Sequence, residues 1–438
     1  MKHGNWLKSG AGFFTNFVWQ IASAAGSAVL GFGYLLYLGR TMGPEQFGLF
    51  SLGAGAILVS FQLCDLRLAE LLVRFLTEYK QSGERGKSDA LVLASFVLST
   101  VSGAAGVIIC SVAGTLFYGR EIDRVSGEYY FVLCALFAAP GILCNAPSLA
   151  ILRMEKRFEQ LAILNIAVAA GKLLVVFLMN FRGQLTALDV VIAAGIVSLA
   201  GNGVQMALAL RAYGKLGRLS AREARLALAP DLPRLRAFFL KNYAFSIVCV
   251  PSKDLDVTLL GYFGDLRTLG SYRIAKSFVG AIGVVADSAF YVCYPEIVRI
   301  RREGAAAVRR YVIRLAKLLG LLGLFLFSTS VVVVPLLIAR IFGAEFQAAE
   351  KLYCILAVGT LIWPPLVWVN PVLLAFDRAG KSVLAALLGG LTSLILLVVL
   401  IPLFGAVGAA ISWVTGGAVG LLVALHLANR HVFFPEQR

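Results

Sequence analysis

The stretch LGRTMGPEQFGLF, residues 38–50, joins two long apolar runs near the start of the chain. A related stretch, LGYFGDLRTLGSY, joins two further apolar runs at residues 260–272, about half of the 438-residue chain later. Each stretch begins with a Leu-Gly pair, carries a glycine at its eleventh position and ends on an aromatic residue. Two similar apolar halves are most simply the parallel repeats of a transporter. Such proteins bind their substrate between the repeats, near the middle of the bilayer.

The composition is that of a membrane protein. Hydrophobic residues make up 59% of the chain and charged residues only 15%, and the mean hydropathy is +0.83. Soluble proteins carry roughly a quarter charged residues, so this much apolar surface requires lipid as its solvent. The net charge of +16 would suggest nucleic-acid binding in a soluble protein. Here the basic residues lie mostly in alternate loops, which the positive-inside rule explains without a nucleic-acid partner.

Hydropathy predicts an all-α polytopic membrane protein with twelve transmembrane helices. Each apolar run is long enough for the ~20 residues that a helix needs to cross ~30 Å of hydrocarbon. A polar, basic linker at 211–236 divides the spans into two six-helix lobes, an N-lobe at 1–210 and a C-lobe at 237–438. The expected spans are 12–38, 47–73, 90–118, 129–152, 160–181, 187–210, 238–262, 269–294, 311–339, 352–374, 382–402 and 406–429.

The basic residues also predict the orientation of the chain. Both termini, the 211–236 linker and the alternate loops on the same side hold most of the Lys and Arg residues, so this side is expected to be cytoplasmic. The first apolar run lacks a small-residue cleavage site, so 12–38 is expected to be a retained span and not a signal peptide. The opposite loops carry only Arg40, Arg120, Arg124, Arg182, Arg267, Arg340 and Lys351.

The sequence contains no set of residues typical of an enzyme. It has no nucleophile–base–acid arrangement and no GxxxxGK[ST] phosphate-binding loop, so neither catalytic residues nor an ATPase activity is expected. The seven cysteines are scattered without a CxxC pair, and the three histidines lie near the termini. The sequence therefore predicts no metal site and no cofactor.

Ionisable residues inside membrane helices are costly, so they are the first candidates for function. In the second span, Asp65, Arg67 and Glu70 lie toward the cytoplasmic end, and Arg67 and Glu70 are i,i+3 neighbours. Asp65 and Glu70 are candidates for ion coupling or for an inner gate, and Arg67 for either the gate or substrate contact. The single Lys172 of the fifth span could pair with an acid or extend its amine to the membrane surface.

A polar stripe marks the seventh span. Its five residues follow one another at steps of four and three, the spacing of a single helical face. They are Asn242, Ser246, Cys249, Lys253 and Asp256. Such a face must meet protein or water, and Pro251 is expected to kink the helix beside it. Lys253 and Asp256 are predicted to bind substrate or to tie helices together as a pair. Asn242 and Ser246 are predicted to line the cavity, and Asp254 to act in ion coupling or gating.

The eighth span carries Arg273, Lys276 and Asp287 on one helical face. No acid lies within one turn of the two bases on their own helix, so either Asp256 or an anionic substrate must neutralise them. Arg273 and Lys276 are therefore predicted to bind substrate, and Asp287 is a further candidate for ion coupling or gating.

The first span carries a matching polar stripe without charges, which is predicted to form the opposite wall of a shared cavity. Its residues are Asn16, Gln20, Ser23, Ser27, Gly31 and Tyr34. Prolines interrupt the fourth and tenth spans at corresponding places. Interrupted helices at matching positions are typical of the moving parts of transporters.

The stretch 38–50 resembles the first-loop signature of bacterial polysaccharide transporters, the flippases of lipid-linked oligosaccharides. Residues 64–75 and 151–158 resemble the same family, although that family usually has glycine at the position of Arg67. The resemblance implies membership of the multidrug/oligosaccharidyl-lipid/polysaccharide exporter superfamily, with two lobes arranged in a V around a central cavity. In the second half it rests on Asp256, Gly270, Ser271, Tyr272, Ala275 and Pro295.

The resemblance further implies a substrate and a location. The expected substrate is a polyprenyl-pyrophosphate-linked glycan, such as an O-antigen, capsular or exopolysaccharide repeat unit. It would be moved from the cytoplasmic to the periplasmic leaflet of the bacterial inner membrane by alternating access, with ion coupling. Membrane lipid, a polysaccharide polymerase and glycosyltransferases are the expected partners.

Two other functions are compatible with the sequence. A drug or cation antiporter of the multidrug and toxin extrusion type would use acids to bind its cation, and Asp254, Asp256 and Asp287 could serve. A non-transporting membrane partner of a glycan synthase would need no charged cavity. The placement of charge favours the flippase, because the two bases of the eighth span have no acid beside them in the sequence.

Overall fold

The protein is described by a computed structural model that covers residues 4–118, 124–142, 144–181, 183, 185–214, 221–248 and 254–433. Within these residues the chain is helical and contains no β-strand. The all-α polytopic fold expected from hydropathy is therefore confirmed.

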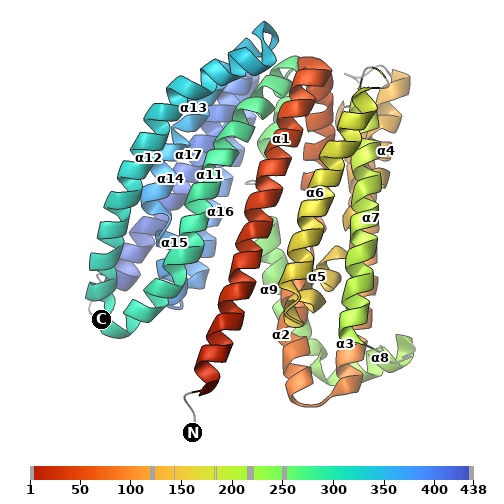
Figure 1. Ribbon diagram of the computed structural model, residues 1–438, viewed down its shortest axis with the longest axis vertical. Helices are drawn as coiled ribbons and strands as arrows, with labels where there is room; N and C mark the ends of the chain where they lie inside the picture. The colour runs from red at the N-terminus through yellow and green to blue at the C-terminus, as the bar shows by residue number, and fades with distance from the viewer. Residues whose placement is uncertain are drawn as a thin grey trace. The chain divides into compact units, whose positions relative to one another are not determined.

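The helices follow one another along the chain with short connections (Figure 1). They are α1 (Gly4–Leu63), α2 (Leu68–Gln81), α3 (Arg85–Tyr118), α4 (Arg124–Ile142), α5 (Asn145–Met154), α6 (Phe158–Asn180), α7 (Ala187–Tyr213), α8 (Ala221–Leu228), η1 (Ala229–Asp231), α9 (Leu232–Val248), α10 (Leu255–Phe263), α11 (Leu266–Ile300), η3 (Arg301–Glu303), α12 (Ala305–Phe342), η4 (Ala344–Phe346), α13 (Gln347–Ala357), α14 (Gly359–Leu366), α15 (Val369–Ala375), α16 (Ala379–Phe404), α17 (Ala406–Ala428) and η5 (Asn429–Phe433).

These helices coincide with the expected membrane spans. Eight helical stretches are long and apolar enough to cross a membrane. The first of them, Val18–Gln81, covers two expected spans, because the chain turns sharply at Gly43, whose φ of 72° precedes Pro44. The fourth, seventh and eighth spans are formed by α4 with α5, by α9 with α10, and by α11. In the part of the chain that the structure describes, each of the twelve expected spans thus contains helix.

The chain packs as two units that differ from its two sequence halves. Unit 1 contains Met1–Tyr34 and Ala56–Ile247, and unit 2 contains Leu35–Gly55 and Val248–Arg438. The segment 35–55 therefore packs with the second half of the chain, and most of α9 packs with the first half. The lobes expected from the sequence stay a prediction about the membrane-spanning repeats.

Within unit 2, the two related stretches 38–50 and 260–272 pack against each other through glycines. A Cβ atom on Gly48 would overlap the backbone carbonyl of Leu266, and a Cβ atom on Gly270 would overlap that of Pro44. When the stretches are aligned from their first residues, Gly48 is equivalent to Gly270 and Pro44 to Leu266. The two overlaps are therefore one contact made twice, once from each copy.

A second pair of contacts repeats this relation. An added Cβ atom on Gly39 would lie 2.7 Å from Cδ1 of Ile274, and one on Gly261 would overlap Cδ1 of Leu52. In the same alignment Gly39 is equivalent to Gly261, and Leu52 to Ile274. Reciprocal contacts are what a two-fold relation between similar segments produces. The sequence repeat is thus expressed as a local two-fold at a glycine seam, formed by Gly39, Gly48, Gly261 and Gly270.

Two spans of unit 1 are broken, and α3 supplies partners for the backbone at both breaks. Between α1 and α2, the hydroxyl of Ser102 donates to the carbonyl of Cys64. Between α4 and α5, the backbone N–H of Cys144 donates to Oγ of Ser99 at 3.2 Å. Unpaired backbone groups are costly in hydrocarbon, so a helix breaks there only where such partners exist.

The fourth and tenth spans are broken at matching places, as their prolines predict. The fourth span is interrupted between Ile142 and Asn145, and the tenth between Leu366 and Val369. The equivalence that relates 38–50 to 260–272 also relates Cys144 in the first break to Leu366 at the second. The two halves therefore share this irregularity as well as the glycine-containing stretch.

The linker docks on the ends of α2 and α3 in unit 1, where α8 lies beside α3 (Figure 1). Asp231 accepts a hydrogen bond from the Tyr79 hydroxyl at 3.1 Å and pairs with Lys87 at 2.9 Å, while Arg234 pairs with Glu78 at 3.1 Å. The hydrogen bond from Lys87 lowers the pKa of Asp231. The contact therefore stabilises the folded protein fully at pH values above the pKa that Asp231 has in the unfolded chain. This stabilisation is lost as the pH falls through the lower pKa that Asp231 has in the folded protein.

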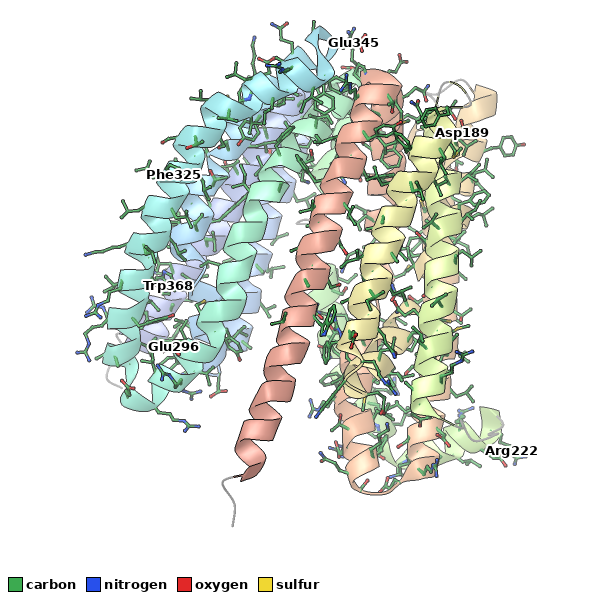
Figure 2. All side chains as sticks on the ribbon, in the orientation of Figure 1. Asp189, Arg222, Glu296, Phe325, Glu345 and Trp368 are labelled. Atoms are coloured by element: carbon green, nitrogen blue, oxygen red, sulfur yellow. The ribbon has the colours of Figure 1, made fainter. Side chains whose placement is uncertain are left out.

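The surface of each unit has an apolar middle and charged ends. Figure 2 places Asp189 and Arg222 at opposite ends of unit 1, and Glu296 and Glu345 at opposite ends of unit 2. Phe325 projects from α12 between the latter two and is 65% exposed. An exposed apolar belt between charged ends is the surface of a multi-pass membrane protein.

The glycine seam predicts that Gly48→Ala lowers the thermal stability of the purified protein. The new methyl group meets a backbone carbonyl, which cannot rotate away as a side chain can, and overpacking of this kind costs about 1–3 kcal/mol. Gly280→Ala on α11 is the matched control, because nothing lies within 4 Å of an added Cβ there. Thermal unfolding in detergent, followed by tryptophan fluorescence, checks both variants. An unchanged melting temperature for Gly48→Ala would contradict the close contact.

Candidate functional site

The candidate site lies in unit 2, where α10 begins beside the second turn of α11. Asp254 adopts a left-handed backbone conformation, with φ 44°, directly before α10 starts. Its carbonyl accepts hydrogen bonds from the backbone N–H and the hydroxyl of Thr258, both at 3.1 Å. On the facing helix, Asp265 caps α11 by accepting a hydrogen bond from the Thr268 N–H at 2.8 Å. Both helix starts are therefore fixed locally, and they present charged side chains toward each other.

Two acids and two bases form a connected ion cluster at this point. The Lys276 ammonium lies 2.8 Å from Oδ1 of Asp254 and 2.8 Å from each carboxylate oxygen of Asp256. Arg273 donates from a terminal nitrogen to the other oxygen of Asp254, at 2.8 Å. The buried hydroxyl of Tyr272 donates to Asp256. We refer to Asp254, Asp256, Tyr272, Arg273 and Lys276 as the ion cluster.

The ion cluster is neutral overall and its lysine is saturated. An ammonium group has three donors, and the contacts to Asp254 and Asp256 occupy them. Asp256 is only 2% exposed, whereas the side chains of Arg273 and Lys276 keep 20% and 14% of their surface. The Lys276 ammonium also lies 5.7 Å from the ring centroid of Trp413 on α17, a favourable cation–π distance. An incoming anion can therefore replace a carboxylate on Lys276, whereas Arg273 gives one hydrogen bond to Asp254 and its guanidinium has further N–H donors.

The polar stripe predicted for the seventh span does not form one continuous helical face. Asp254 is left-handed directly before α10 starts at Leu255, so the helical spacing is interrupted before Asp256. Lys253, like Cys249 and Pro251, lies outside the described residues. Asn242 and Ser246 belong to unit 1, whereas Asp256 belongs to unit 2.

Within unit 1, one of the two predicted residues of α9 contacts another helix. Ser246 is buried and accepts a hydrogen bond from the side-chain amide of Gln62 at 2.8 Å, which joins α9 to the end of α1. The side chain of Asn242 donates to the carbonyl of Phe238, one turn earlier on α9 itself, at 3.1 Å. Whether Asn242 and Ser246 line a transport cavity stays a prediction.

The predicted group of the second span is brought together at the break between α1 and α2. Arg67 has a left-handed backbone, with φ 48°, and pairs with Glu70 at 2.7 Å. The backbone N–H of Arg67 donates to the carboxylate of Asp65 at 2.9 Å. The i,i+3 pair expected from the sequence therefore forms, but at the start of a new helix and not within a continuous span. A gate, coupling or substrate role for these residues stays a prediction.

The uncharged stripe of the first span lies on α1. Ser23 is buried and accepts a hydrogen bond from the side-chain amide of Asn165 on α6 at 3.1 Å, while Gln20 is exposed. Ser27 and Tyr34 are partly buried. The side chain of Asn16, like that of Asp287 on α11, lies outside what the structure describes.

Sequence reasoning missed two members of the site. Tyr272 is the terminal aromatic of the repeated stretch, so the repeat itself was a signal for it. Trp413 lies in a strongly apolar span without any local signal. Asp254 pairs with both bases, and its expected role in ion coupling or gating stays a prediction. Within the described residues, no group of three or more His, Cys, Asp or Glu side chains could hold a metal ion.

Comparison with known proteins matches the chain to a family and to a fold. The family model described as polysaccharide biosynthesis protein matches residues 13–301. A structure of the lipid II flippase MurJ in an inward closed conformation gives a TM-score of 0.69 at 15% identity, covering 94% of this chain and 88% of that one. A comparison with proteins of curated function finds no match.

Multidrug transporters share the same fold. An inward-facing MATE family transporter of the MOP superfamily gives a TM-score of 0.64 at 14% identity, covering 94% of both chains. The MATE multidrug transporter DinF-BH, in a structure with a bound ligand, gives 0.63 at 13% identity, covering 96% of this chain and 95% of that one. At these identities the likeness concerns the fold alone.

The ion cluster predicts that Lys276→Met destabilises the protein. The substitution leaves two facing carboxylates with Arg273 as their remaining base, and breaking a buried pair costs about 3–5 kcal/mol. The double variant Lys276→Met/Asp256→Asn removes one charge of each sign and should recover most of the loss. Melting temperatures of the three proteins, with the exposed Lys351→Met as control, test this. A double variant no more stable than Lys276→Met alone would show that the two side chains are not energetically coupled.

Proposed function

We propose that this chain, which belongs to the polysaccharide biosynthesis protein family, is a flippase for a polyprenyl-diphosphate-linked oligosaccharide. The glycan head group would move from the cytoplasmic to the periplasmic leaflet of the bacterial inner membrane while the polyprenyl tail stays in lipid. No bond is made or broken in this process. The protein's task is to stabilise a charged, hydrated head group within a layer that otherwise excludes it.

One observation carries the choice of an anionic head group over a cationic substrate. Every carboxylate within the expected spans whose side chain is described already accepts a hydrogen bond from a donor. Asp65 holds the backbone N–H of Arg67, and Glu70 holds its guanidinium. Asp254 and Asp256 hold Arg273 and Lys276. A cation antiporter needs a carboxylate that can bind its cation, and Glu70, Asp254 and Asp256 are already paired with a base.

The ion cluster suggests how a diphosphate would bind. A phosphate oxygen is an acceptor like a carboxylate oxygen, and charge-assisted hydrogen bonds from arginine and lysine to phosphate are strong. A diphosphate could therefore take the place of Asp254 on Arg273 and Lys276, while Asp256 stays on the lysine. In the empty carrier the carboxylates would keep the bases neutralised. Such an exchange of partners gives substrate a differential affinity for one conformation, which is what drives a conformational shift.

The antiporter and the synthase-partner alternatives have less support. The MATE transporters share the fold, but a shared fold does not fix the substrate. A partner without transport activity would have no use for four matched charges inside two neighbouring membrane spans, which are costly to insert.

The proposed orientation places both termini and the 211–236 linker in the cytoplasm, following the distribution of basic loops. Arg222 on α8 is exposed and lies at one end of unit 1 (Figure 2). A cysteine introduced there should react with a membrane-impermeant maleimide only after the cells are opened. Reaction in intact cells would contradict the proposed orientation.

Cells that lack this chain should accumulate a polyprenyl-diphosphate-linked glycan and lose the corresponding surface polysaccharide. The block falls after glycan assembly on the lipid and before its use on the other side. Extraction of lipid-linked glycans with mass spectrometry, together with surface polysaccharide staining, measures both effects. Complementation with the wild-type chain or with Lys351→Met should restore export. Normal polysaccharide with a raised sensitivity to cationic drugs would instead support the antiporter.

A further inference from the structure

One membrane cation stands apart from the ion cluster. Lys172 lies in α6, eight residues before its end at Asn180, or ~12 Å along the helix. It is partly buried. Within the described part of the chain it forms no hydrogen bond, ion pair or ring contact, and no charged group acts on it. Arg67, Arg273 and Lys276, by contrast, each hold a carboxylate.

The face of α6 that carries Lys172 is the face that packs on α1. Asn165 lies seven residues earlier, which is close to two full turns and therefore on the same face. Its amide donates to Ser23 on α1 at 3.1 Å. In the next turn of α1, a Cβ atom on Gly26 would lie 3.1 Å from Ile166 of α6. All of these residues belong to unit 1. The cation therefore lies ~10 Å further along a helix pair whose contact is established.

Beyond this contact, α1 offers an unsatisfied hydroxyl and open space. Oγ of Ser27, one turn after Ser23, is buried and has no hydrogen-bond partner among the described residues. Nothing lies within 4 Å of a Cβ atom added to Gly31, one further turn on. Side chains on a helix lean toward its N-terminus, and this brings the long side chain of Lys172 back toward the level of Ser27. The Lys172 ammonium and the Ser27 hydroxyl, both without acceptors among the described residues, are therefore expected at a similar height along the two helices.

We propose that Lys172 and Ser27 bind one phosphate group of the translocated diphosphate, as a second anion site in unit 1 that is separate from the ion cluster. This inference rests on the proposed function and adds the residues that make first contact. In the ion cluster, Lys276 must release a carboxylate before it accepts an anion, whereas Lys172 has nothing to release. The chemical complement of two donors without acceptors is an acceptor-only group, and a phosphate supplies several such oxygens.

Direct binding of a defined lipid tests the proposal. The probe is undecaprenyl diphosphate, titrated into the purified full-length chain in detergent and followed by native mass spectrometry. Lys172→Met should bind about ten-fold more weakly, the loss expected for one charge-assisted hydrogen bond. Lys172→Arg should keep most of the affinity and Ser27→Ala should show a smaller loss. Lys351→Met, which removes an exposed lysine of unit 2, should bind as the wild type does.

The outcomes separate this proposal from the function on which it rests. Methionine is apolar and is tolerated in a membrane helix, so the Lys172→Met protein should stay folded. An unchanged melting temperature verifies that it is folded. If the wild type binds undecaprenyl diphosphate and Lys172→Met binds it equally well, the flippase proposal stands and the Lys172 site is overturned. If Lys172→Met weakens the binding of phosphatidylglycerol by the same factor as the binding of undecaprenyl diphosphate, the residue binds ordinary anionic lipid and the site is likewise overturned. A wild type that binds no polyprenyl diphosphate contradicts the proposed function itself.

Discussion

The three hydrogen bonds of the Lys276 ammonium to Asp254 and Asp256 set the electrostatic condition for this protein. A charged side chain within a membrane span must pair with an opposite charge or bind a ligand, because lipid hydrocarbon offers it no polar partner. Arg273 and Lys276 come from α11, and their partners come from the start of α10, where the seventh span has resumed as helix. The interruption of that span allows the ion pairs to form. With Asp254 in a left-handed conformation, its carboxylate contacts Arg273 and that of Asp256 contacts Lys276.

Arg67, like the two bases of the ion cluster, is paired with an acid, whereas Lys172 is not paired within the described residues. Arg67 holds Glu70 at the break between α1 and α2, and the ion cluster balances two acids with two bases. Lys172 is the exception on α6. A carrier of an anionic head group needs cations that can change partner, and these two kinds of site differ in how readily they do so. Lys276 in the ion cluster exchanges a carboxylate for the anion, whereas the unpaired ammonium of Lys172 binds the anion directly.

The glycine seam provides the framework around the site. Gly270 lies in the first turns of α11, shortly before Arg273 and Lys276, and packs on the backbone of Pro44. Segment 35–55 thereby belongs to unit 2 and holds the helix start that carries both bases. In membranes, where the hydrophobic effect does not press helices together, small residues that allow close backbone contact provide much of the association. A substitution in the seam should therefore affect the ion cluster as well as the local packing.

Much of this could be read from the sequence, for identifiable reasons. Hydropathy located the twelve spans, and the recurrence of 38–50 at 260–272 revealed the repeat. The i,i+3 spacing also gave the Arg67–Glu70 pair. Periodicity assigns residues to faces but not faces to partners, so the packing of one repeat on the other and the role of Trp413 were out of reach. The stripe from Asn242 to Asp256 assumed unbroken helix, whereas the left-handed Asp254 interrupts the spacing before Asp256. Periodicity does not show where a helix breaks, because a break needs tertiary partners such as those that Ser99 and Ser102 supply in unit 1.

The central claim, that the chain moves a diphosphate-linked glycan lipid between leaflets, is tested most directly in purified form. The protein is reconstituted into phosphatidylcholine vesicles with a polyprenyl-diphosphate oligosaccharide that carries a fluorophore on its sugar. Dithionite, added outside, reduces only fluorophores that reach the outer leaflet. The account predicts that vesicles with protein lose nearly all fluorescence, while protein-free vesicles keep the signal of the inner leaflet. Identical residual fluorescence in the two preparations, with the protein folded and inserted, would contradict it.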